Sequence, residues 1–315
     1  MPDKTAQTET KLWDEITKAI IHTMTPRILP VIKEAYGKEY PPGTSLTLLS
    51  TEHSTYLDNP EETPANRLMD IAILVAGTDC YHIECQMKND RLMVIRMVAY
   101  DLHFALQHDL TQEAVTGEII LRFPQSFVIY PVQNDNIPDK LQCRLIFPDG
   151  NQYIYRIPTI CIQTYSLKDI HEKHLDFFIP FTLLRFRSRL DSKTNKLTEK
   201  ELTGFVKRLI VNLKKEVDAG VLTEMELNDY INLLHMASKH IFQKHPTYHK
   251  EVLKVTEPMI KLPSVQIREL QQVIAKNEET LAQNAALLAQ NAETLAQKDA
   301  IIAELERKLA ALLSQ

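Results

Sequence analysis

Apolar residues at helical spacing follow a polar stretch at the start of the chain, residues 1–10, which we expect to be disordered. An amphipathic helix is predicted by the recurring apolar positions Trp13, Ile16, Ile20 and Met24. A second helix is expected over 26–37, although Pro30 would remove a hydrogen bond from its interior. Apolar residues between 92 and 106 predict a third helix.

Short apolar runs predict strands between and after these helices. The strands are expected at 45–49, 127–132, 143–147, 153–157 and 159–164. The polar, proline-containing segment 51–66 is expected to be a loop, and Asp149 with Gly150 is typical of a two-residue hairpin turn. This order of elements predicts an α/β (α+β) fold in which helices flank a mixed central sheet.

A further β-hairpin is expected over 70–88, where two apolar runs meet at Gly77 and Thr78. Side chains alternate between the two faces along a strand. The core face would therefore take Ile83, Cys85 and Met87. The opposite face would take the polar side chains of His82, Glu84 and Gln86, which form a candidate site.

The length of the hairpin turn decides whether a second carboxylate joins this polar face. If the turn holds an odd number of residues, such as 76–78, Asp70 pairs with Glu84 across the two strands. Their Cβ atoms would then be about 5 Å apart, close enough for both carboxylates to bind one cation. A two-residue turn at 77–78 would pair Asp70 with Cys85 instead.

Two capping boxes mark helix starts in the second half of the chain. They begin at Thr198 and Thr223, each followed three residues later by a glutamate, and predict helices over 199–218 and 224–243. Gly220 fits the C-terminal cap of the first. Because charged residues are frequent over 185–200, we place a boundary there, between a domain over 11–190 and a helical region over 191–262.

Residues 263–315 repeat with a period of seven. One heptad position is apolar throughout: Ile267, Ile274, Leu281, Leu288, Leu295, Ile302 and Leu309. The position three residues later is polar in the middle of the repeat, with asparagine at 277, 284 and 291. This pattern predicts a C-terminal coiled coil through which the chain forms a homo-oligomer. The alternative is a single amphipathic helix packed on its own domain.

Charge and cysteine content narrow the function classes. The net charge of −5 provides no overall attraction to nucleic acid, so phosphate binding would need a local basic patch or metal ions. The four cysteines form no CxxC pair and residues 1–5 have no signal pattern, which predicts a reduced, cytoplasmic protein. The apolar run at 71–77 is far shorter than a membrane span, so we expect no membrane partner.

The hairpin and the helix after it resemble a known family. The supporting segments are Arg67-Leu68-Met69-Asp70, Tyr81-His82-Ile83-Glu84-Cys85-Gln86 and Ile95-Arg96-Met97-Val98-Ala99-Tyr100-Asp101, with further likeness at 127–131 and 179–185. Over residues 10–190 the chain resembles the PD-(D/E)XK nuclease superfamily. More narrowly, it is similar to bacterial PD-(D/E)XK family transposases and recombination-promoting nucleases, in which glutamine replaces the usual lysine. The resemblance implies a restriction-endonuclease-like core and DNA as the substrate.

The resemblance also implies roles for individual residues. Asp70, Glu84 and the backbone carbonyl of Cys85 would bind Mg²⁺, with Mn²⁺ as the alternative ion. The cation would activate water to hydrolyse a phosphodiester bond, and Gln86 would position that water or the phosphate. An amide carries no charge, so Gln86 stabilises the reaction less than lysine would.

Accessory residues are also expected around this centre. Many members of the family also use a glutamate on the first core helix, and Glu34 is the candidate by position. Glu52, just after the first expected strand, is the alternative. His82 is either catalytic or a hydrogen-bonded structural histidine. Arg96 and Tyr100 lie one helical turn apart and could simply pair with carboxylates or cover the sheet. The functional alternative is that Arg96 holds Glu84 in place or contacts the phosphate.

A basic stretch and a pair of histidines are weaker candidates for binding sites. A basic stretch could follow a DNA backbone through Arg185, Arg187, Arg189, Lys193 and Lys196, although a solvated connector explains it equally well. His171 and His174 have a spacing compatible with zinc, but no third ligand is evident. We therefore expect an Mg²⁺-dependent endodeoxyribonuclease of the transposase or recombination type. The alternative is a catalytically inactive scaffold of the same fold that self-associates through its coiled coil.

Overall fold

The computed structural model describes residues 4–49, 70–90, 92–108, 110–112, 117–132 and 136–259. All of these residues belong to one compact unit, residues 1–260. The predicted coiled coil at 263–315 and the expected loop at 51–66 lie outside the described residues. No helix in the described part of the chain is both long and apolar enough to cross a membrane.

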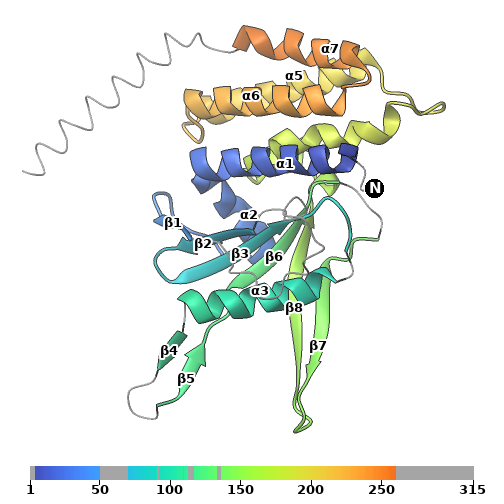
Figure 1. Cartoon of the computed structure of the whole chain (residues 1–315). Coiled ribbons are helices and arrows are strands. Elements are labelled where there is room, and N and C mark those ends of the chain that lie inside the picture. Colours follow the sequence, from blue (N-terminus) through green and yellow to red (C-terminus); the bar gives the residue numbers. More distant parts are fainter. Residues whose placement is uncertain are drawn as a thin grey trace, which may run out of the picture. The chain divides into compact units, whose positions relative to one another are not determined.

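A six-stranded mixed sheet forms the centre of this unit (Figure 1). Its strands, in spatial order, are β1 (Leu46–Leu49), β2 (Asp70–Val75), β3 (Asp79–Cys85), β6 (Gln125–Tyr130), β8 (Gln152–Cys161) and β7 (Lys140–Ile146). The first three strands are antiparallel, β3, β6 and β8 run parallel, and β7 returns antiparallel to β8. Two short strands, β4 (Leu110–Gln112) and β5 (Ile119–Leu121), pair separately. The predicted mixed sheet flanked by helices is confirmed.

Helices cover both faces of the sheet, as Figure 1 shows. One face packs in the main core with α1 (Lys4–Thr23), the 3₁₀ turn η1 (Thr25–Ile28), α2 (Leu29–Tyr36) and the long 3₁₀ segment η4 (Asp176–Arg189). The opposite face packs against α3 (Met93–His108) in a second, smaller core. Side chains of β6 alternate between the two cores. Phe127 and Ile129 lie in the main core, and Val128 and Tyr130 lie in the smaller one.

The N-terminal helices differ from expectation in two places. The backbone of residues 4–10 is helical and belongs to α1, so the expected disorder of 1–10 is wrong for these seven positions. The predicted helix over 26–37 is divided into η1 and α2. Pro30 consequently lies in the first turn of α2, where its missing N–H would have had no helical partner.

The last two strands of the sheet, β7 and β8, also differ from the prediction. The two strands expected at 153–157 and 159–164 are one continuous strand, β8, which is followed by a 3₁₀ turn, η3 (Ile162–Thr164). The β7–β8 hairpin has its expected position, but Ile146 pairs with Gln152, which leaves five residues between the strands rather than two. Gly150 adopts φ +85° and donates to the carbonyl of Phe147, so this loop needs glycine there.

The C-terminal helices begin where their caps predicted. The helices α5 (Glu199–Asp218) and α6 (Glu224–Ile241) both start with complete capping boxes, from Thr198 and Thr223. They are followed by α7 (Pro246–Thr256) and the short η5 (Glu257–Met259). Local hydrogen bonding at a helix start depends on residues three apart in sequence, which explains the accuracy of this prediction.

The boundary expected near residue 190 does not separate two cores. Apolar side chains of α5, α6 and α7 belong to the same buried cluster as those of α1 and η4. Trp13 contacts Phe181 with ring centroids 5.7 Å apart, and Phe186 meets Phe205 at 5.0 Å. Arg27 also donates to Glu226 at 2.8 Å. The charged segment 185–200 therefore belongs to one continuous unit rather than separating two.

Two histidines form hydrogen bonds between α6 and α7, and we expect them to make the stability of the fold sensitive to acid. His235 contacts the hydroxyl of Thr256 at 2.5 Å, and His249 contacts that of Ser238 at 2.9 Å. Burial lowers the pKa of both imidazoles, although Glu257 acts in the opposite direction. Because the unfolded chain takes up these protons near pH 6.5 while the folded chain does so only at lower pH, stability should fall as the pH decreases through this value.

Thermal unfolding at pH 7.5 and pH 5.5 would measure this effect. The decrease in Tm between the two pH values should be smaller in His249→Gln than in the wild type. It should be unchanged in the control His22→Gln, since His22 is an exposed residue of α1. An equal pH dependence in all three proteins would contradict the assignment.

Candidate functional site

The β2–β3 turn contains three residues, Ala76 to Thr78, because Val75 pairs with Asp79. The first two adopt left-handed conformations, with φ of 54° at Ala76 and 72° at Gly77. This odd turn length pairs Asp70 with Glu84. The register prediction is therefore confirmed, and the alternative pairing of Asp70 with Cys85 is excluded.

The polar residues of β3 lie on the sheet face that α3 covers. His82, Glu84 and Gln86 have exposed fractions of 3%, 2% and 7%. Tyr81 and Ile83 point the other way, into the main core. The predicted alternation is confirmed, but the polar face is buried beneath a helix, where each polar atom needs a partner.

Asp101 of α3 is the centre of a hydrogen-bond network on this face. Its carboxylate is fully buried and contacts Nδ1 of His82 at 2.7 Å. It also accepts from the hydroxyl of Ser126 at 2.8 Å and from the hydroxyl of Tyr155. Burial beside this carboxylate raises the pKa of Tyr155, so its hydroxyl stays protonated and donates. The network joins α3 to β3, β6 and β8.

The Asp101 network is not a nucleophilic triad. In such a triad the serine hydroxyl gives its proton to the histidine, which the carboxylate orients. Here the Ser126 hydroxyl donates directly to Asp101, and its side chain is only 3% exposed. His82 contacts Asp101 through Nδ1, as a hydrogen-bonded structural histidine would, and its catalytic role stays a prediction.

Asp101 was not among the predicted site residues, although its position along α3 carries a signal. Met93, Met97, Asp101 and Ala105 follow one another at intervals of four along α3, and all are buried. A carboxylate at a core position of a helix must meet donors from the neighbouring sheet. Ser126 and Tyr155 carried no comparable signal, since only the tertiary structure brings them together.

Glu84 has one satisfied and one unsatisfied carboxylate oxygen. Its Oε1 accepts from Nε2 of Gln86 at 2.6 Å. Its Oε2 is buried and has no hydrogen-bond partner among the residues that the structure describes. The backbone N–H of Gln86 donates to the carbonyl of Ile129 at 2.8 Å, which holds this residue against β6. A buried, unpartnered carboxylate oxygen is suited to a cation.

The carboxylates of this face fit a hard metal ion only in part. Asp70 occupies the register position opposite Glu84, but its side chain is outside the described set. Within that set, no group of three or more histidine, cysteine, aspartate or glutamate side chains is arranged to hold a metal ion. Any such site would therefore combine Glu84 with Asp70 and with backbone or water oxygens.

The accessory residues occupy varied positions. Arg96 pairs with Asp90 at 3.1 Å rather than with Glu84, and the ring of Tyr100 packs edge-on against His82 with centroids 6.1 Å apart. Glu34 accepts from Lys173 at 2.6 Å and from Tyr165 at 3.1 Å. Glu52 lies outside the described residues.

The basic stretch after η4 divides into structural and exposed residues. Arg185 is half-buried, donates to the carbonyl of Tyr165 at 3.1 Å and stacks over the ring of Phe205. Arg189 pairs with Glu201 at 3.0 Å. The side chains of Arg187, Lys193 and Lys196 are exposed.

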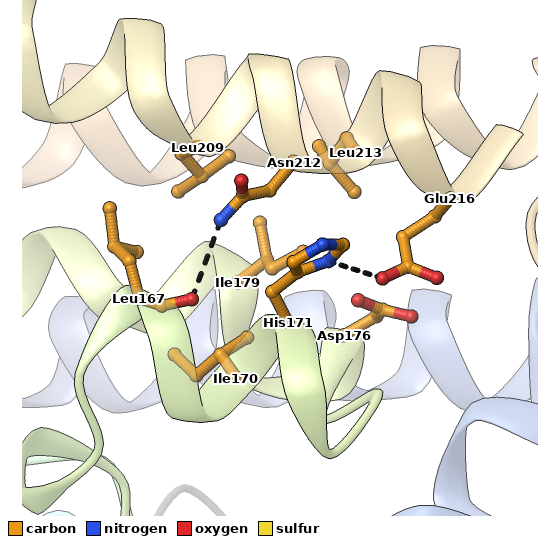
Figure 2. Close-up of a pocket in the computed structure, with 9 residues that line it drawn as sticks. All are labelled: Leu167, Ile170, His171, Asp176, Ile179, Leu209, Asn212, Leu213 and Glu216. Atoms are coloured by element: carbon orange, nitrogen blue, oxygen red, sulfur yellow. Dashed lines mark hydrogen bonds and ion pairs between the residues drawn. The ribbon is translucent and has the colours of Figure 1, made fainter. Parts of the chain in front are cut away.

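A second polar cluster lines a small pocket between α4 (Leu167–Glu172), η4 and α5 (Figure 2). The carboxylate of Glu216 contacts both His171 and His174, the second at 3.0 Å. Asp176 lies close to it and has a buried Oδ2 with no hydrogen-bond partner in the described part of the chain. Both histidines therefore contact the same carboxylate, that of Glu216, which is distant in sequence and was not predicted.

Asp176 should make stability fall as the pH rises. Burial and the nearby charge of Glu216 raise the pKa of Asp176 to about 7. The folded chain therefore holds this proton up to about pH 7, while the unfolded chain releases it near pH 4. Asp176→Asn, which mimics the protonated form, should increase the free energy of unfolding at pH 8 by roughly 2–4 kcal/mol.

Urea unfolding of Asp176→Asn at pH 5 and pH 8 would test this. The advantage of the variant should shrink towards pH 5, where the wild-type carboxyl is already protonated. Asp218→Asn, an exposed residue at the end of α5, serves as the control and should show no such pH dependence. An advantage of equal size at both pH values would show that charge is not its cause.

Comparisons with known proteins found no relative of this chain. No protein-family model, no curated protein and no solved structure matches the chain.

Proposed function

We propose that this chain is a metal-dependent DNA endonuclease of the transposase or recombination-associated type. One observation carries the proposal: the three-residue turn pairs Asp70 with Glu84, and Glu84 has a buried carboxylate oxygen with no partner among the described residues. Around this pair a helix precedes three antiparallel strands, and α3 and the separate β4–β5 pair precede the parallel strand β6. This order supports the resemblance to PD-(D/E)XK nucleases.

The residues of the site would have distinct roles. Asp70 and Glu84 would hold Mg²⁺ or Mn²⁺, which lowers the pKa of a bound water and offsets charge on the phosphate oxygens. Gln86 holds Glu84 through its amide N–H, so it orients the carboxylate. Asp101 links α3 to His82 of β3 and Ser126 of β6 on the face that carries Glu84.

A non-catalytic scaffold is the alternative function. It is favoured by the Gln86–Glu84 hydrogen bond, which occupies one oxygen of a proposed metal ligand and supplies no positive charge. In that case the fold would serve self-association through the heptad segment at 263–315.

Plasmid cleavage distinguishes the two functions. The full-length protein should nick or linearise supercoiled DNA with Mg²⁺ or Mn²⁺, and excess EDTA should abolish the reaction. Absence of cleavage with either ion would favour the scaffold.

A further inference from the structure

Two buried hydrogen-bond donors on the α3 side of the sheet have no hydrogen-bond partner within the described residues. They are the hydroxyl of Tyr130, on β6, and the Nε–H of Arg96, on α3. Tyr130 is fully buried, whereas the side chain of Arg96 is 33% exposed. An unsatisfied buried donor destabilises a fold, so its presence needs an explanation.

The strand register places Tyr130 at the same end of the site as Gln86. Glu84 is the lateral neighbour of Val128, and the N–H of Gln86 donates to Ile129. Two residues along each strand from the Glu84–Val128 pair, Gln86 and Tyr130 follow on the same face. Tyr130 is therefore a diagonal neighbour of Glu84, about 7–8 Å away between Cα atoms.

Arg96 lies above this end of the sheet. Its guanidinium donates to the sulfur of Met93 at 3.0 Å, and Met93 packs with Tyr130 in the smaller core. Arg96 also acts electrostatically on the Tyr130 hydroxyl, together with Asp90. Since Arg96 is partly exposed, this end of the buried face borders solvent.

We propose that the Tyr130 hydroxyl and the Arg96 Nε–H bind a non-bridging oxygen of a phosphodiester placed beside Glu84. This inference rests on the proposed function and deepens it. Glu84 Oε2, the Tyr130 hydroxyl and Arg96 Nε have no hydrogen-bond partners within the described residues. In the substrate complex the carboxylate oxygen would bind the cation and the two donors would bind the anionic phosphate, so all three atoms would gain partners.

Tyr130 acts as a donor and not as a nucleophile. Burial raises its pKa to about 12, and Asp90 adds to this while Arg96 opposes it. The hydroxyl is therefore protonated at neutral pH, which suits donation to phosphate and disfavours attack on phosphorus.

Tyr130→Phe in the full-length protein tests the inference. Because the lost hydroxyl has no partner in the free protein, the Tm should stay equal or rise. Cleavage of plasmid DNA should fall about tenfold or more, since one donor to the reacting phosphate is removed. The control Tyr153→Phe changes an exposed tyrosine of β8 and should alter neither quantity. A marked decrease in Tm, or wild-type cleavage, would overturn the inference.

Thermal shifts with inorganic phosphate separate this inference from the proposed function. In EDTA, millimolar phosphate should raise the Tm of the wild type and of Tyr153→Phe, but less that of Tyr130→Phe. If the wild type cleaves no DNA yet shows this pattern, the anion site holds and the nuclease function fails. If it cleaves DNA and Tyr130→Phe behaves as wild type in both assays, only the anion site fails.

Discussion

Asp101→Ala should destabilise the protein by about 3–5 kcal/mol. Asp101 is fully buried and accepts from Ser126 and Tyr155 while it contacts His82. Its removal leaves these three polar groups without their shared partner and breaks the polar contacts between α3 and the sheet, while the apolar packing of α3 remains. Urea denaturation followed by circular dichroism would give the free energy of unfolding.

Milder variants keep this prediction testable if Asp101→Ala does not fold. Tyr155→Phe and Ser126→Ala each remove one donor and should cost about 1–2 kcal/mol, whereas Tyr153→Phe should change stability by less than about 0.5 kcal/mol. Asp139→Ala, at an exposed loop position, is the control for the loss of a carboxylate. An Asp101→Ala protein as stable as this control would contradict the structural role of the network.

Glu84→Gln should abolish cleavage, with a loss of at least about 10²–10³-fold, while the protein stays as stable as the wild type or becomes more stable. The variant keeps an oxygen that can accept from Gln86, and it removes a buried charge whose Oε2 has no partner in the described chain. The substitution would remove a ligand of the proposed metal ion, whereas the hydrogen bond from Gln86 can still form. Asp70→Asn should lower cleavage in the same way.

Plasmid cleavage and thermal unfolding should be measured on the same preparations. Glu172→Gln changes a glutamate whose side chain is 60% exposed and should leave both quantities unchanged. Cleavage equal to the wild type in Glu84→Gln would remove Glu84 from the reaction. A large decrease in its Tm would instead assign Glu84 a structural role.

Local sequence determined the elements of this protein well. The capping boxes at Thr198 and Thr223 predicted the starts of α5 and α6, because each depends on contacts within four residues. The alternation along β3 predicted which residues face the core, because side chains of a strand alternate regardless of context. The errors lay where long-range packing decides, as in the single strand β8 and the absent boundary near residue 190.

Only the tertiary structure decided how the polar groups meet. The sequence was compatible with a two-residue and with a three-residue β2–β3 turn. The left-handed backbone of Ala76 and Gly77 forms the three-residue turn, which pairs Asp70 with Glu84. Asp101 meets Tyr155, 54 residues later in the chain, and His171 meets Glu216. Such partners carry no mutual signal in a single sequence, since burial and long-range packing, rather than local propensity, bring them together.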